Sequence, residues 1–384
     1  MSYISPPQSW DIFCKVVDNY GDIGVCWRLA RQLAGEHGLR VRLWVDDLPA
    51  FRRICPEIDA AQTVQTYREV EVRCWGEPFP DVEPAQAVVE AFACELPDRY
   101  IQSLAAAAIK PCWINLEYLS AEDWVGECHG MASPNPRLPL SKRFFFPGFA
   151  SNTGGVLMER DLPLRRQAFQ QDAEAQAAFW QELGLPQPAE AECRISLFCY
   201  PGSRAEDLFA LWRDRTGPVT CLVPEGIVRE AIATFFGQIT PPAGSTLRRG
   251  NLEVRILPFL DQDQYDRLLW ACDCNFVRGE DSFVRAQWAL KPFVWQPYPQ
   301  SEGTHLRKLE AFLRIYCRDL PEEVATAVAD LWQGWSHGVE PGESWPAYWT
   351  QRKILARHAD KWAAALQEIG EMAAKLAGFC PNKL

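Results

Sequence analysis

Short apolar runs alternate with amphipathic segments along two separate stretches of the chain, and this alternation constrains the fold more than any other feature. In the first stretch the apolar runs are 12–17, 41–45, 87–92 and 112–116. Apolar residues at 25, 26, 29, 30 and 33 form a helical stripe, and Pro97 suits the first turn of a second helix over 97–108. Strand, helix and strand at this spacing predict a parallel sheet covered on both faces.

The same alternation restarts after a polar stretch, 162–192, that is rich in Gln, Ala and Glu. The expected strands there are 194–200, 219–223, 253–257, 274–277 and 293–295, and the expected helices are 204–214, 262–271 and 283–290. Because 384 residues are too many for one ordinary core, the sequence predicts an α/β fold of two facing Rossmann-like domains with an interdomain cleft. The expected division is a domain over 1–160, a linker over 161–192 and a domain over 193–349, with a helical segment over about 350–384 packing back on the first domain.

Composition excludes several classes of function. The net charge is −11, whereas a protein that binds nucleic acid through its phosphates needs a basic face, so no nucleic-acid partner is expected. The 14 cysteines are dispersed without a C-x-x-C pair, which is typical of reduced cytosolic thiols and gives no zinc-binding spacing. Neither a signal peptide nor an apolar stretch of about 20 residues is evident. We therefore expect a cytoplasmic protein with no metal and no membrane partner.

The loop after the first expected strand is the first candidate site. Ligands of open parallel sheets bind beyond the carboxyl ends of the strands. Asp18 and Asp22 lie in this loop, and Gly21 and Gly24 let another molecule approach the backbone. One aspartate alone would be read as a turn or helix cap. Two carboxylates suit an arginine nucleophile, since one can orient the guanidinium and the other can accept its proton, but they also allow a hydroxyl acceptor.

A second candidate loop precedes an expected helix of the second domain. Gly279 lets backbone amides approach an anion, Ser282 is an expected helix N-cap, and Arg278 can clamp a diphosphate leaving group. Such a clamp would stabilise the leaving group without a metal ion. An ordinary capped helix with a solvated charge cluster explains the short motif equally well. Glu280 and Asp281 suit a diphosphate site only if they bind sugar hydroxyls or a cationic acceptor.

Aromatic and amide side chains at the same expected sheet edge suggest a nucleotide pocket. Phe259 and Tyr265 can sandwich a base while Gln262 reads its edge. Tyr200 and Tyr298 follow two further expected strands. Each of these side chains taken singly is more often a packing residue, so the prediction depends on their meeting at one edge.

Three long phrases resemble one family. DNYGDIGV (18–25), NLEYLSAE (115–122) and RGEDSFVRAQ (278–287), together with EAFAC (90–94) and PGF (147–149), are similar to the EarP family of protein-arginine rhamnosyltransferases, in the same order along the chain. The resemblance implies a GT-B fold, dTDP-β-L-rhamnose as the donor substrate, inversion at the anomeric carbon and no metal cofactor. The partner it implies is elongation factor P, which is modified on one arginine of its N-terminal domain and so activated to rescue ribosomes stalled at polyproline.

The resemblance also implies roles for individual residues. Asp22 corresponds to the general base, Asp18 to the neighbour that positions the acceptor, and Glu280 to a further essential carboxylate. The residues implied for the donor site are Arg278, Gly279, Asp281, Ser282, Tyr200, Phe259, Gln262, Tyr265 and Tyr298, and those implied for the acceptor loop are Asn19, Tyr20 and Gly21. For Glu117 the better interpretation is a hydrogen-bonded residue that braces its loop.

Three alternative functions are compatible with parts of the sequence. The first is a GT-B enzyme with another nucleotide-sugar donor or a hydroxyl acceptor, for which the paired aspartates lose their rationale. The second is a non-catalytic nucleotide-sugar sensor, which would tolerate asparagine at position 22. The third, an α/β hydrolase, is disfavoured because no G-x-S-x-G motif is present.

Overall fold

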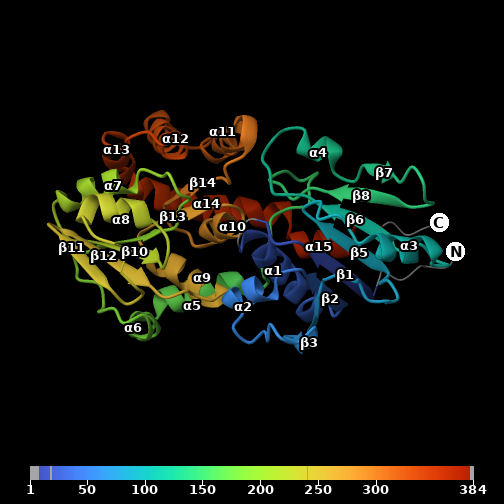
Figure 1. The fold of residues 1–384 in the computed structure, drawn as a ribbon. Coiled ribbons are helices and arrows are strands. Elements are labelled where there is room, and N and C mark those ends of the chain that lie inside the picture. Colours follow the sequence, from blue (N-terminus) through green and yellow to red (C-terminus); the bar gives the residue numbers. More distant parts are fainter. Residues whose placement is uncertain (1–7, 18–19, 240, 381–384) are drawn as a thin grey trace. The chain divides into compact units, whose positions relative to one another are not determined.

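The computed structural model describes residues 8–17, 20–239 and 241–380 and divides the chain into two compact units (Figure 1). Unit 1 consists of the residues up to Arg160 and those from Leu366 onward, and unit 2 is Asp161–Ala365. Each unit contains its own mixed sheet. Among the described residues, none of the helices combines the length and apolar character needed to cross a membrane.

The sheet of unit 1 has eight strands in the order β3-β4-β2-β1-β5-β6-β8-β7. The strands are β1 (Ser9–Cys14), β2 (Arg40–Val45), β3 (Val64–Tyr67), β4 (Val70–Cys74), β5 (Ala87–Ala91), β6 (Cys112–Leu116), β7 (Ala132–Pro134) and β8 (Ser141–Phe145). All neighbours pair in parallel except β3 with β4 and β7 with β8 at the two edges. The carboxyl ends of β1, β5 and β6 are therefore adjacent.

The first strand begins at Ser9, earlier than the expected 12–17. The prediction missed this start because a buried charged residue, Asp11, interrupts the apolar pattern. Asp11 is fully buried, and its carboxylate accepts two hydrogen bonds of 2.6 Å from the Arg42 guanidinium of β2. The Trp44 indole N–H donates to the same carboxylate over 3.1 Å. These partners satisfy the charge inside the sheet. The strand ends at Cys14, and Val17 already belongs to the following loop.

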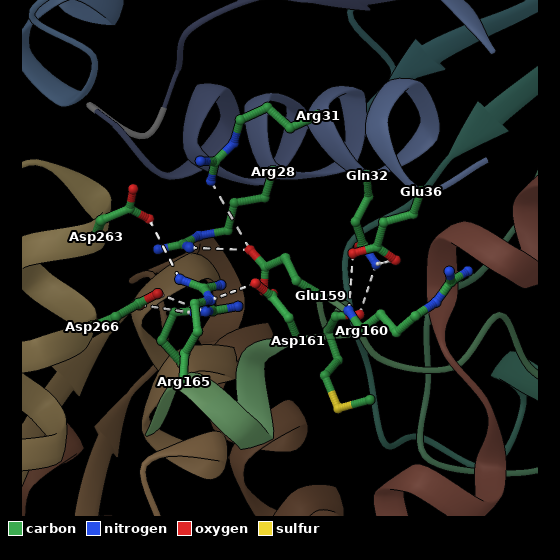
Figure 2. A network of polar contacts seen from close by, with 12 residues as sticks. Arg28, Arg31, Gln32, Glu36, Glu159, Arg160, Asp161, Arg165, Asp263 and Asp266 are labelled. Atoms are coloured by element: carbon green, nitrogen blue, oxygen red, sulfur yellow. Dashed lines mark hydrogen bonds and ion pairs between the residues drawn. The ribbon is translucent and has the colours of Figure 1, made fainter. Parts of the chain in front are cut away.

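Helices α1 (Gly21–Gly35), α2 (Leu48–Ile54), α3 (Asp98–Ala106), α4 (Val125–Cys128) and α15 (Met372–Ala377) complete unit 1. Almost every residue of α1 is buried, and α15 packs against it. Figure 2 shows Arg28 of α1 directed at Glu159, with 3.4 Å between the guanidinium Nη1 and the carboxylate Oε1. Glu36, just past the end of α1, accepts a hydrogen bond of 2.9 Å from the Arg160 backbone N–H. The last residues of unit 1 before the chain enters unit 2 are thus bound to this one helix.

The sheet of unit 2 has six strands in the order β11-β12-β10-β9-β13-β14. The strands are β9 (Cys193–Leu197), β10 (Val219–Pro224), β11 (Thr246–Arg249), β12 (Leu252–Leu257), β13 (Cys274–Arg278) and β14 (Phe293–Gln296). Only β11 runs antiparallel to its neighbour. The carboxyl ends of β12, β9, β13 and β14 consequently lie at one edge of the sheet.

The helices of unit 2 are α5 (Leu162–Gln171), α6 (Ala173–Glu182), α7 (Ala205–Arg213), α8 (Arg229–Phe236), α9 (Gln262–Ala271), α10 (Asp281–Trp288), the 3₁₀ turn η1 (Ser301–Gly303), α11 (Thr304–Tyr316), α12 (Glu322–His337), α13 (Ser344–Thr350) and α14 (Arg352–Ile369), whose end extends into unit 1. Many aromatic residues are buried here. Phe283 of α10 stacks on Trp295 of β14, with ring centroids 3.9 Å apart. The high tryptophan content of the sequence is largely used in packing of this kind.

The stretch 161–192 is part of unit 2, not a separate linker as the sequence suggested. Its helix α5 buries Leu162 and Phe169. Phe169 contacts Trp270 of α9, with ring centroids 5.8 Å apart, and the Gln170 side chain donates to the Trp270 carbonyl over 3.1 Å. The helix has few apolar residues, so its composition resembles that of a linker although its contacts are those of a domain.

The C-terminal segment also differs from the expectation that all of 350–384 packs on the first domain. Most of α14 belongs to unit 2, where Trp362 contacts Tyr316 of α11 with ring centroids 5.2 Å apart. The segment from Leu366 onward belongs to unit 1. There the Lys375 ammonium donates to the Thr153 carbonyl over 2.8 Å.

Candidate active site

Asp22 lies in the first turn of α1, where the first β-strand has passed into the helix. It is 2% exposed, and its carboxylate accepts hydrogen bonds from the Val17 backbone N–H (2.9 Å) and the Tyr118 hydroxyl (3.0 Å). Tyr20 occupies the N-cap position and Gly21 begins the helix. Asp22 is therefore not the helix cap that the alternative interpretation required. Asp18 and Asn19 lie outside the described residues.

Tyr118 is a neighbour of Asp22 that the sequence does not predict. Tyr118 follows β6, and its ring stacks on Phe92, which follows β5, with centroids 4.3 Å apart and planes 14° apart. The strand order brings these two residues beside the end of β1. Both belong to phrases that carry the family resemblance, but no spacing rule links residues 96 positions apart. Glu117, the preceding residue, accepts a hydrogen bond of 2.5 Å from the Asn115 side chain, as the bracing interpretation predicts.

Arg278, at the end of β13, is held by groups that follow β9. Its guanidinium carbon lies 4.2 Å from the ring centroid of Phe198 and 4.5 Å from that of Tyr200. Its Nη1 donates to the Cys199 carbonyl over 2.8 Å. The positive charge is thus fixed at the carboxyl edge of the unit 2 sheet, facing two aromatic rings. Phe198 is a second residue that sequence reasoning did not identify.

The turn from β13 into α10 is closed by a different residue from the one predicted. Glu280 occupies the N-cap position, and Ser282 lies inside the helix, so the prediction of Ser282 as the N-cap was wrong. The Ser282 hydroxyl instead donates to the Arg278 carbonyl over 2.5 Å and accepts from the Arg278 N–H over 3.1 Å. Gly279 has a φ of +61°, which glycine adopts without strain. Asp281 is the first residue of α10, where a negative charge is favoured.

Gln262 and Tyr265 lie on α9, after β12, and Phe259 lies between the two elements. Phe259 is partly exposed and Gln262 is 8% exposed. Tyr265 packs edge-on against Phe198, with ring centroids 6.0 Å apart. Burial raises the pKa of the Tyr265 hydroxyl, and the nearby Ser282 side chain opposes this rise. These residues share one sheet edge with Arg278, as the prediction of a nucleotide pocket requires.

Tyr200 and Tyr298 complete this edge. Their rings meet edge to face with centroids 5.5 Å apart, and Tyr298 is 44% exposed whereas Tyr200 is buried. Gln296 fixes the arrangement, since its side-chain Oε1 accepts from the Tyr200 N–H over 2.9 Å and its carbonyl accepts from the Gly279 N–H over 3.0 Å. A pocket of about 180 Å³ borders Tyr200 and Arg278.

The structure shows no ready metal site in the part of the chain that it describes. No group of three or more His, Cys, Asp or Glu side chains is arranged there to hold a metal ion. The 14 cysteines are free thiols, nine of which are buried. Burial raises the pKa of the Cys199 thiol to about 11, which disfavours the thiolate at neutral pH.

Known proteins resemble this chain over nearly its whole length. A relative from Pseudomonas putida, a protein-arginine rhamnosyltransferase, is 47% identical over 98% of this chain and 99% of its own length. A protein-arginine rhamnosyltransferase from Pseudomonas aeruginosa is 48% identical over 97% of this chain and 98% of its own length. A solved structure from work on EarP-mediated arginine glycosylation of translation elongation factor EF-P is 36% identical, covers 98% of this chain and 99% of its own, and has a TM-score of 0.71.

A glycosyltransferase structure from Rickettsia africae is 8% identical over 96% of both chains, with a TM-score of 0.50, and so shows a likeness of fold alone. Together with the two mixed sheets, these likenesses establish the α/β GT-B fold that the resemblance implied. The family model for elongation-factor P (EF-P) rhamnosyltransferase EarP matches residues 10–381. This chain therefore belongs to the EarP family of protein-arginine rhamnosyltransferases.

Proposed function

We propose that this protein is a cytoplasmic enzyme that transfers L-rhamnose from dTDP-β-L-rhamnose to an arginine side chain of elongation factor P, with inversion at the anomeric carbon. The observation that carries the proposal is the family match over residues 10–381. The hydrogen-bonded carboxylate of Asp22 in unit 1 and the fixed guanidinium of Arg278 in unit 2 support the proposal.

The acceptor half of the reaction depends on Asp22. An arginine guanidinium has a pKa above about 12 and a delocalised lone pair, so it attacks carbon only when it is oriented and loses a proton as the bond forms. A carboxylate held by Val17 and Tyr118 is a preorganised proton acceptor. In the proposed step a guanidino nitrogen forms a bond to the anomeric carbon and Asp22 takes its proton. Asp18 and Glu280 are the further carboxylates that we propose for acceptor binding.

The donor half depends on the carboxyl edge of the unit 2 sheet. As the new bond forms, the bond from the anomeric carbon to the diphosphate oxygen breaks, and dTDP leaves with the electron pair. Arg278 offers a fixed positive charge to the diphosphate, and the first turn of α10 offers backbone N–H groups. The rings of Phe259, Tyr265 and Tyr298 are the proposed contacts of the base, with Gln262 reading its edge.

Mass spectrometry of elongation factor P after incubation with the enzyme and dTDP-rhamnose tests the proposal. We expect one deoxyhexose on one arginine, and NMR of the product should show the inverted anomeric configuration. A deoxyhexose on serine or threonine, or no modification, contradicts the proposal. Asp22→Asn should nearly abolish turnover while the dissociation constant for the donor stays within a few-fold of wild type. A sensor without catalytic function would show donor binding and no transfer in either protein.

A further inference from the structure

Asp22 is held by a side chain that is itself held by an aromatic stack. Its Oδ1 accepts a hydrogen bond from the Tyr118 hydroxyl. The Tyr118 ring in turn stacks on the Phe92 ring, with their planes 14° apart. The three residues follow three adjacent parallel strands, β1, β6 and β5. A carboxylate, a hydroxyl and a supporting ring thus form one continuous series of contacts inside unit 1.

The backbone at Phe92 suggests that its ring has a specific task. Phe92 and Ala93 have φ values of +56° and +52°, and the Cys94 N–H donates to the Ala91 carbonyl over 3.2 Å. Two central residues with positive φ are the pattern of a type I′ turn, in which glycine and asparagine are strongly preferred. A phenylalanine is unfavourable in such a turn. From this backbone position its ring stacks on that of Tyr118.

The turn is also anchored to the strand that leads to Tyr118. The Phe92 N–H donates to the carbonyl of Leu116, the last residue of β6, over 2.7 Å. Residues 92 and 118 are therefore connected both through the backbone at the sheet edge and through their rings. Both rings are partly exposed, so the stack is not simply part of the buried core.

We infer that Tyr118 is a positioning residue for the transfer, which orients the Asp22 carboxylate toward the acceptor, and that Phe92 acts through Tyr118 by fixing the direction of its hydroxyl. The inference deepens the proposed function and rests on it. Loss of the hydroxyl removes the hydrogen bond to Oδ1 and keeps the one that the Val17 N–H donates to Oδ2. Misorientation of a catalytic group affects the chemical step more than binding of the donor.

The test compares Tyr118→Phe, which keeps the ring and removes the hydroxyl, with Phe92→Leu, which keeps the hydroxyl and removes the stack. We expect kcat to fall about 10- to 100-fold in Tyr118→Phe and less in Phe92→Leu, with the dissociation constant for dTDP-rhamnose unchanged in both. Phe92→Tyr retains an aromatic ring and should restore most of the activity lost in Phe92→Leu. Phe144→Leu, which breaks a stack with Phe146 in the same unit, is the control and should keep the wild-type kcat.

The double variant separates positioning from a general packing role. If Phe92 acts through the Tyr118 hydroxyl, Phe92→Leu has no further effect on kcat in the Tyr118→Phe background. Multiplicative losses, or equal losses in the Phe144 control, would overturn the inference. So would a wild-type kcat in Tyr118→Phe.

Wild-type enzyme that leaves every arginine of elongation factor P unmodified refutes the proposed function instead. Crystal structures of the two single variants give a readout that needs no activity. An Asp22 carboxylate that keeps its wild-type orientation in Tyr118→Phe counts against the inference, and a rotated carboxylate supports it.

Discussion

The Arg278 guanidinium carbon lies 4.5 Å from the ring centroid of Tyr200, at the carboxyl edge of the unit 2 sheet. The same guanidinium donates to the Cys199 carbonyl. A planar, delocalised cation can stack on a ring and donate in its own plane at the same time, whereas an ammonium group cannot. Only an arginine side chain can therefore adopt this orientation with both contacts at position 278.

Arg278→Lys should weaken donor binding although the positive charge is retained. The lysine ammonium loses the stacked orientation and the paired donors that suit a diphosphate, so we expect the dissociation constant for dTDP-rhamnose, measured by calorimetry, to rise about tenfold or more. Arg204→Lys is the matched control, because Arg204 is 41% exposed in its side chain and pairs with Asp207 at the surface. Equal donor affinity in wild type and Arg278→Lys would show that the geometry at this position is unimportant.

Asp266→Asn should strongly destabilise unit 2. Asp266 and Arg285 are each 1% exposed and form two hydrogen bonds of 2.9 and 2.6 Å between α9 and α10. The substitution leaves a buried guanidinium without its carboxylate, and we expect a loss of about 3–5 kcal/mol in the free energy of unfolding. Chemical denaturation measures this loss. The control is Asp214→Asn at the exposed Arg213–Asp214 pair, which should cause no measurable change.

Glu371 should make the stability of the protein fall as the pH rises. Burial, reinforced by the nearby Glu36, raises the pKa of Glu371 from 4.5 to about 7, against the opposing hydrogen bonds of the Ala373 and Ala374 N–H groups. Because the folded protein binds the proton more tightly than the unfolded chain, this stabilisation is complete below pH 4.5 and is lost as the pH rises through about 7. The free energy of unfolding falls by roughly 3 kcal/mol at most when Glu371 loses its proton.

Glu371→Gln provides the measurement, since the amide carries no titrating proton. The free energy of unfolding of the variant should rise relative to that of wild type between pH 5 and pH 8. The altered helix cap adds only a difference that does not depend on pH. Asp172→Asn is the control, because Asp172 caps α6 through two similar backbone contacts at an exposed site. Parallel stability curves for wild type and Glu371→Gln would contradict the assigned pKa.

Helix α9 shows which parts of the fold could be predicted from sequence. Its bounds, Gln262–Ala271, match the prediction because the apolar period coincides with a capping box formed by Asp261 and Gln264. The edge hairpin β3–β4 was not predicted, since its strands are short and half-exposed. The start of β1 was missed because Asp11 is charged, and a buried ion pair is visible only when β2 is placed beside it.

In the candidate site, the loop residues could be predicted from the sequence, but the residues that strand order places beside them could not. Asp22 and Arg278 stand out because they sit in glycine-containing loops that follow strands. Tyr118 and Gln296 do not stand out, because their roles depend on which strands are neighbours. The order β1-β5-β6 brings Tyr118 to Asp22, and the order β9-β13-β14 brings Gln296 to Tyr200. Local sequence therefore identifies the charged loop residues, whereas the residues that orient them are found only from the strand order.

Gly155→Ala should loosen the C-terminal segment that begins at Leu366 from the rest of unit 1. Gly155 has a φ of +73°, and a methyl group there would lie 2.1 Å from the Gly370 carbonyl oxygen, at the point where Met372 N–H donates to the Val156 carbonyl. Since this contact is between backbones, it cannot be relieved by rotating a side chain. Gly184→Ala separates the strain of a positive φ from the steric contact, because Gly184 has a φ of +68° and no atom within 4 Å of such a methyl group. We expect Gly184→Ala to cost about 1–2 kcal/mol from the backbone alone, and Gly155→Ala to cost more. Hydrogen exchange should show faster exchange over α15 in Gly155→Ala only, and equal exchange there in the two variants would mean that the close approach does not hold the segment.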